Sequence, residues 1–91
     1  MKIKYYAYLR EEAGCKEESL SGSFTALSLL RFLGEKHGPG LSRHLLSPEG
    51  DEIHADLIFL LDGRHIEFLN NKETIIPENS IVSLFPRIAG G

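Results

Sequence analysis

Residues 25–38 carry the one long helical pattern in the sequence, and this segment limits the possible folds more than any other. Its apolar residues recur at the spacing of a single helix face: Ala26, Leu29, Leu30 and Leu33. Thr25 is a suitable N-cap before the run, and Gly38 followed by Pro39 is typical of a helix end. The chain must therefore bury one main helix, and everything around it follows strand patterns.

These strand patterns are short, and they occupy residues 2–9, 18–20, 57–61, 65–69 and 81–85. The first of them alternates, with one face formed by Ile3, Tyr5, Ala7 and Leu9. The sequence LIFLL at 57–61 does not alternate, which predicts a strand covered on both faces. Asp62-Gly63 after it is a two-residue hairpin signal.

The connecting segments are polar or rich in glycine and proline. Residues 10–16 read as a polar turn containing Gly14. Residues 38–55 are predicted to form a long connector, in which Leu41, Leu45 and Leu46 indicate one helical turn packed on the core. Pro86 is expected to end the hydrogen-bonded ladder of the last strand, since proline has no N–H to donate.

The order strand, strand, helix, then further strands predicts an α+β fold in which one main helix packs on one face of a mixed sheet of four to five strands. The right-handed crossover rule places later strands beside the first one and parallel to it. If residues 81–85 pair with residues 2–9, the chain leaves the sheet from its middle, which gives the final residues a rigid base.

Composition limits the size and class of the protein. With 91 residues, 42% hydrophobic and 25% charged, we expect a single globular domain spanning residues 1–91. A net charge of -3 disfavours nucleic acid and anionic membranes as partners. The single cysteine cannot form a disulfide within the chain, which favours a reducing compartment. No apolar run approaches the ~18 residues that a membrane span needs, so we expect a cytoplasmic protein.

The stretch Pro86-Arg87-Ile88-Ala89-Gly90-Gly91 is the most informative feature for function. Glycine has no Cβ, so an extended Gly90-Gly91 backbone fits a slot that excludes larger residues and leaves the α-carboxylate open to attack. The alternative is a frayed chain end without a role. Because a buried strand and a proline precede these glycines, we expect residues 86–91 to form a flexible tail that enters a partner.

Other candidate sites are weaker. Ile88 is expected to contact a partner or pack on its own strand end, and Arg87 to meet an acidic lip or remain solvated. Cys15 lies in a polar segment without a signal of reactivity. The four histidines lack the spacing of a metal site, and we expect no metal: His37, His44, His54 and His65. We also expect no intrinsic acid, base or nucleophile.

Three stretches resemble a known family: MKIKYYAYLREEAG, LLDGRHI and ENSIVSLFPRIAGG are similar to the MoaD/ThiS family of sulfur carriers, which share the ubiquitin-like β-grasp fold. The similarity follows the whole chain and is sharpest where Phe85-Pro86 and Gly90-Gly91 match the family pattern. The Phe-Pro pair and the long connector resemble the molybdopterin synthase small subunit more than the shorter thiazole-pathway carrier. The family commonly has a second proline where this sequence has Arg87.

The resemblance implies a mechanism in which Gly91 is the reacting residue and residues 85–90 contact partners. A ubiquitin-activating-type enzyme would join the Gly91 carboxylate to AMP from ATP, and sulfur from a persulfide donor would convert it to a thiocarboxylate. In the molybdopterin pathway the tail would insert into the large subunit of a heterotetrameric synthase and give sulfur to a pterin precursor. The carrier itself would bind no cofactor.

The sequence leaves other functions open. A ubiquitin-like modifier would join the same Gly91 carboxylate to lysines, and a non-covalent interaction module would not use its glycines. Among sulfur carriers, the recipient could be a pterin, a thiazole, an amino-acid precursor or a tRNA base. For docking we expect the exposed sheet face and the strand edges near the tail, with Tyr6, Tyr8 and Phe68 as candidate anchors. The alternative is that Tyr6 and Tyr8 only cover their own sheet.

Overall fold

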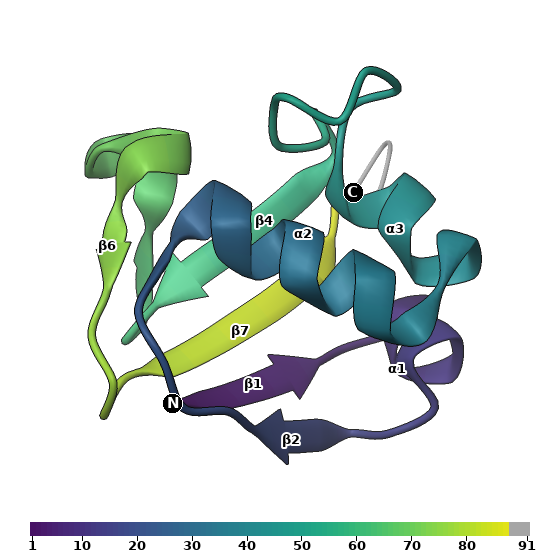
Figure 1. The fold of residues 1–91 in the computed structure, drawn as a ribbon, viewed down its shortest axis with the longest axis horizontal. Coiled ribbons are helices and arrows are strands. Elements are labelled where there is room, and N and C mark those ends of the chain that lie inside the picture. The colour runs from purple at the N-terminus through teal and green to yellow at the C-terminus, as the bar shows by residue number, and fades with distance from the viewer. Residues whose placement is uncertain (88–91) are drawn as a thin grey trace.

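The computed structural model describes residues 1–87 and contains a five-stranded mixed sheet with helices on one face (Figure 1). The strand order is β2-β1-β7-β4-β5, with these bounds: β1 Lys2–Tyr5, β2 Glu17–Ser19, β4 Leu57–Leu61, β5 Arg64–His65 and β7 Ile81–Pro86. A second sheet of two strands joins β3 (Phe24–Thr25) to β6 (Ile75–Ile76). The predicted α+β architecture is confirmed.

The helix α2 (Ala26–His37) crosses the sheet as predicted (Figure 1). Thr25 and Ser28 form a reciprocal capping box: Thr25 Oγ1 accepts from the Ser28 N–H at 3.2 Å, and Ser28 Oγ accepts from the Thr25 N–H at 2.8 Å. The predicted stripe of Ala26, Leu29, Leu30 and Leu33 is fully buried. Gly38 ends the helix at a positive φ of 96°, which favours glycine.

Two shorter helices, α1 (Tyr8–Ala13) and α3 (Pro39–Leu45), complete the helical layer, and two single turns, η1 (Ile66–Phe68) and η2 (Asn71–Glu73), follow β5. The predicted helical turn in the connector is confirmed as α3, whose Leu41 and Leu45 are fully buried. The predicted strand at 65–69 is wrong beyond His65, because the chain turns into η1 and buries Ile66.

The first strand is shorter than predicted, and the polar turn at residues 10–16 is wrong for its first half. Strand β1 ends at Tyr5, Ala7 takes a positive φ of 54°, and α1 begins at Tyr8. Leu9 is buried as expected, but it reaches the core from the helix, while Ala7 is exposed. The pattern misled because Leu9 continues the alternation of the strand, whereas in the structure it forms the buried side of α1 together with Ala13, four residues later.

The strand β4 is not covered on both faces, which corrects the interpretation of LIFLL. Leu57, Phe59 and Leu61 are buried beneath the helices, whereas Ile58 and Leu60 are only half-buried on the other face. We call this other side of the sheet the open face. The apolar residues of the open face lie on β7 and β4. On the neighbouring strand β1, the open face is charged and carries Lys2 and Lys4.

The last strand, β7, lies at the centre of the sheet, between β1 and β4 (Figure 1). It is parallel to β1, with Tyr5 opposite Leu84, and antiparallel to β4, with Leu57 opposite Pro86. The predicted parallel pairing and central exit are confirmed. The part of the tail that matters most, residues 88–91, lies outside the described residues.

Candidate functional site

The tail does not begin at Pro86, which corrects the prediction that this proline ends the ladder. Pro86 is buried and belongs to β7, and the Arg87 N–H donates to the Asp56 carbonyl at 2.6 Å. Since N–H groups alternate in direction along a strand, the nitrogen of Pro86 faces the β1 side. There β1 has already ended at Tyr5, so the missing donor leaves no gap in the ladder.

An aromatic stack supports the end of β7. The ring of Tyr6 lies on the ring of Phe85, with centroids 4.2 Å apart and planes only 10° from parallel. The guanidinium of Arg10 lies 5.8 Å from the Tyr6 centroid, and its Nε donates to the Tyr5 carbonyl at 3.2 Å. The stack anchors the last residues of the strand from the α1 side, which sequence reasoning did not find.

Arg87 is also held from the opposite side. Its guanidinium lies 3.8 Å from Glu67 Oε1 on η1, with both side chains about half exposed: 50% and 55%. An exposed pair at this distance contributes little stability. The pairing nevertheless gives the Arg87 side chain an acidic partner within its own chain. From the sequence we expected this side chain to contact an acidic lip on a partner protein or to remain solvated.

The candidate anchors do not form one surface. Tyr6 is half-buried against Phe85, whereas Tyr8 packs on His44 of α3, with centroids 4.9 Å apart. Phe68 is 83% exposed on η1. The open face therefore draws its apolar surface from Tyr6 and Phe85 together with these half-exposed residues of β4 and β7: Ile58, Leu60 and Ile81.

Cys15 and the histidines do not form a reactive or metal-binding group in the described part of the chain. Burial raises the pKa of the Cys15 thiol, and the nearby Glu18 carboxylate raises it further, although Lys36 opposes this effect. A raised pKa disfavours the reactive thiolate. Within residues 1–87 no group of three or more His, Cys, Asp or Glu could hold a metal ion.

Sequence reasoning missed a partly buried polar cluster around Glu18. Glu18 of β2 accepts a hydrogen bond from the fully buried Tyr5 hydroxyl at 2.7 Å, pairs with His37 Nε2 at 2.5 Å and also pairs with Lys36. The cluster fastens the edge strand β2 to the C-terminal end of α2. Its partners are 13 to 19 residues away from Glu18 in sequence, so no local spacing could reveal it.

No helix within residues 1–87 has the length and apolar character required to cross a bilayer.

Comparisons with known proteins agree with this geometry. A family model described as the ThiS family matches residues 3–91. The solution structure of small archaeal modifier protein 1 from Methanosarcina acetivorans is 30% identical, with a TM-score of 0.83 over 99% of this chain and 94% of that one. A search of curated proteins finds no match.

Two further structures share the fold at lower identity. The Amycolatopsis orientalis BexX/CysO complex contains a chain that is 18% identical, with a TM-score of 0.81 over 99% of this chain and 98% of that chain. The putative molybdopterin converting factor, subunit 1, of Pyrococcus furiosus is 21% identical, with a TM-score of 0.72 over 96% and 95%. With the β-grasp arrangement and the central last strand, these findings show that the chain belongs to the ThiS family of ubiquitin-like sulfur carriers and modifiers.

Proposed function

We propose that this protein carries sulfur as a thiocarboxylate on Gly91, and that molybdopterin synthesis, with the protein as small subunit of the synthase, is its pathway. The observation that supports this most is the path of β7. The central strand stays hydrogen-bonded through Arg87, only four residues before Gly91. At most about 14 Å of extended chain would then separate a rigid base from the reacting carboxylate.

The chemistry requires activation, because a carboxylate oxygen is a poor leaving group. An adenylating enzyme of the ubiquitin-activating type would transfer AMP from ATP to the Gly91 carboxylate and release pyrophosphate. A persulfide would then attack the carbonyl carbon and displace AMP, and a thiol would reduce the resulting acyl disulfide to the thiocarboxylate. The carrier's own residues would position the tail, and the partners would supply ATP and sulfur.

The open face is the proposed docking surface for these partners. Aromatic and aliphatic residues favour the centre of interfaces, and Tyr6, Phe85, Ile58 and Leu60 lie together where β7 leads to the tail. A partner seated there would receive the tail in a fixed direction. The same surface would serve the adenylating enzyme and the large subunit of the synthase in turn.

A second function is protein modification through the same carboxylate, with lysine as the final nucleophile. The similarity to small archaeal modifier protein 1 supports this function, since that structure has the highest sequence identity of the three compared here. The two functions share activation and differ only in the group that attacks the activated carbon.

One experiment in the source cell separates these functions. The Gly91-deleted chain is expressed in place of the natural one, and both molybdopterin content and high-mass conjugates on denaturing gels are measured. Loss of molybdopterin without conjugates supports the sulfur carrier, and Gly91-dependent ladders support the modifier. Unchanged molybdopterin and unchanged gel patterns would refute both.

A further inference from the structure

The end of β7 is supported differently on its two sides. On the β4 side the ladder runs to the last described residue, since the Arg87 N–H donates to the Asp56 carbonyl at 2.6 Å. On the β1 side the last backbone hydrogen bond to β7 within residues 1–87 joins the Tyr6 N–H to the Leu84 carbonyl at 3.1 Å. Residues 85–87, which lead into the tail, therefore depend on side-chain contacts on that side.

Arg10 of α1 completes the side-chain contact on the β1 side. Phe85 covers one face of the Tyr6 ring, and the Arg10 guanidinium lies over this ring, 5.8 Å from its centroid. The negative face of an aromatic ring attracts such a cation. Arg10 Nε also donates to the Tyr5 carbonyl at 3.2 Å, so the guanidinium is fixed to the end of β1. We call Arg10, Tyr6 and Phe85 the Arg10 stack.

A strained turn places Arg10 in this position. Ala7 has φ 54° and ψ -139°, a combination that glycine adopts easily and other residues rarely adopt. Helix α1 begins directly after Ala7, and the Arg10 N–H donates to the Ala7 carbonyl at 3.1 Å. Backbone strain is concentrated at functional sites, where the surrounding structure must hold it in place. The strain beside the Arg10 stack therefore indicates a role for the stack beyond packing.

Arg10 has no ion pair that would give it another role in the described part of the chain. It is exposed, and none of the ion pairs found within residues 1–87 includes it. Its side chain contacts the Tyr5 carbonyl and the Tyr6 ring. Loss of this side chain therefore frees the Tyr6 ring without leaving a buried charge unpaired or a cavity in the core.

We propose that Arg10 is a positioning residue for the reaction at Gly91. It holds Tyr6 against Phe85 and so fixes the direction in which β7 leads into the tail. The inference rests on the proposed function, in which an oxygen of the Gly91 carboxylate attacks the α-phosphorus of ATP and pyrophosphate leaves. Arg10 touches neither ATP nor the carboxylate. Without it, the bound carrier presents its tail in the productive direction for less of the time, and adenylation slows.

The test is adenylation of the full chain by the adenylating enzyme of its own cell, measured as pyrophosphate release in a single turnover with the enzyme in excess. The dependence on enzyme concentration separates the maximal rate from the half-saturation concentration. Arg10→Ala is expected to lower the maximal rate about threefold, the size of an exposed cation–π contact. The half-saturation concentration should stay unchanged, because Tyr6, Phe85 and the rest of the open face are still present. Arg10→Lys keeps a cation near the ring and should recover most of the rate.

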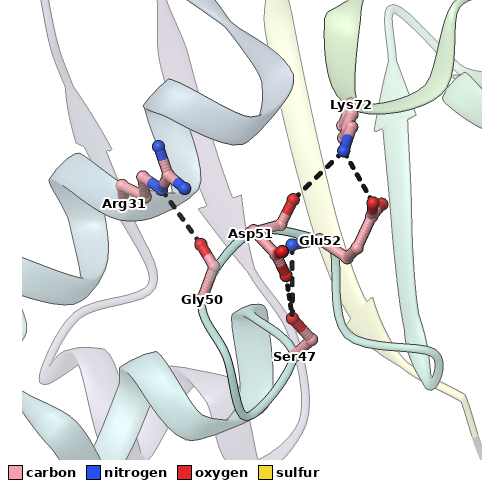
Figure 2. Close-up of polar contacts among 6 residues, drawn as sticks. All are labelled: Arg31, Ser47, Gly50, Asp51, Glu52 and Lys72. Atoms are coloured by element: carbon pink, nitrogen blue, oxygen red, sulfur yellow. Dashed lines mark hydrogen bonds and ion pairs between the residues drawn. The ribbon is translucent and has the colours of Figure 1, made fainter.

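Arg31→Ala is the matched control. Arg31 of α2 is also exposed, and its Nε likewise donates to a backbone carbonyl, that of Gly50 at 3.0 Å (Figure 2). The loop that carries Gly50 is held from its other side by Lys72, whose Nζ donates to the Asp51 carbonyl at 3.2 Å (Figure 2). Helix α2 covers the face of the sheet opposite the open face, so Arg31 does not support the Arg10 stack (Figure 1). Both kinetic parameters should match those of the wild type.

Amide nitrogen relaxation of the free carrier gives an independent readout. Arg10→Ala should lower the order parameters of Phe85 and Arg87 and leave that of Val82, earlier in β7, unchanged. The proposal is overturned by an unchanged maximal rate, a raised half-saturation concentration, an equal loss in Arg31→Ala, no recovery in Arg10→Lys, or unchanged order parameters at Phe85 and Arg87. Absence of pyrophosphate release with the wild-type chain would instead refute the proposed function, and this inference with it.

Discussion

Replacing Glu18 by glutamine tests the polar cluster that fastens β2 to α2. The side chain of Glu18 is 11% exposed and receives donors from Tyr5, Lys36 and His37. Glutamine keeps the shape and one acceptor oxygen, but it removes the charge that strengthens these bonds. Hydrogen bonds to a charged group contribute about 1.5–3 kcal/mol and neutral ones about 0.5–1.5.

Glu18→Gln should therefore remove about 1 kcal/mol of stability for each hydrogen bond to this side chain that is sheltered from water. Lys36 is 45% exposed and regains hydration, so its contribution is discounted. The Tyr5 hydroxyl and His37, which is 14% exposed, are sheltered. We expect Glu18→Gln to lower the free energy of unfolding by about 2 kcal/mol at neutral pH, which is about 10 °C in Tm for a chain of this size.

The effect should depend on pH in a defined direction. Burial disfavours the Glu18 carboxylate, but hydrogen bonds from Lys36, Tyr5 and His37 outweigh it and lower the pKa below the ordinary value of 4.5. The stabilisation is thus complete above the unfolded pKa and is lost as the pH falls through the lower folded pKa. The difference between wild type and Glu18→Gln should shrink as the pH falls below 4.5.

Urea unfolding followed by circular dichroism at neutral and acid pH measures these differences. Glu17→Gln is the matched control on the same strand, since Glu17 is 49% exposed and its 3.2 Å pair with Lys2 lies on the surface. We expect a change of at most about 0.5 kcal/mol there. Equal effects of the two substitutions, or a Glu18→Gln effect that grows as the pH falls, would refute the reasoning.

Three further predictions concern packing, capping and docking. Gly34→Ala should lower the free energy of unfolding in urea by about 1–2 kcal/mol despite alanine's higher helix propensity, because the new Cβ meets Ser42. Gly40→Ala is the control, since its new Cβ meets only the movable end of a glutamate side chain. A change above about 0.5 kcal/mol in Gly40→Ala would contradict this account. Thr25→Ala should cost about 1 kcal/mol by the same assay, and no loss would refute the role of the cap. Tyr6→Ala should weaken binding of an adenylating partner in calorimetry, and unchanged affinity would remove the open face from the docking surface.

The sequence was sufficient to predict the helix α2 and a later strand parallel to the first. Periodicity and a Thr25 cap define α2 locally, and the crossover rule predicts the parallel neighbour of β1, which the structure shows to be β7. The position of the tail at the sheet centre followed from these two features. The resemblance, which follows the whole chain and is sharpest over the last dozen residues, predicted the family that the comparisons confirm.

Features that depend on an unusual backbone turn or on distant neighbours could not be predicted. Helix α1 was read as strand and turn because the fate of Leu9 depends on the turn at Ala7. Pro86 stays in the ladder only because β1 ends early, which no property of Pro86 itself reveals. The Glu18 cluster joins residues from two strands and a helix, and their spacing in sequence carries no signal.

The roles given to Gly91, to residues 88–90 and to the partners remain predictions. Ile88, Ala89, Gly90 and Gly91 lie outside the described residues, and the structure supports their roles only through the rigid strand that leads to them. The expectations of no bound cofactor, ATP use by a partner enzyme and a cytoplasmic location likewise remain predictions.

The central claim is that the Gly91 carboxylate is the reacting group, and intact mass spectrometry of protein purified from its own cells tests it most directly. We expect a fraction of the chains to be heavier by the difference between one sulfur and one oxygen atom, with fragmentation placing the change on Gly91. This fraction should disappear in cells lacking the adenylating enzyme. A chain that shows only an unmodified carboxylate in cells actively making its sulfur-dependent product, or sulfur located on Cys15, would contradict the account.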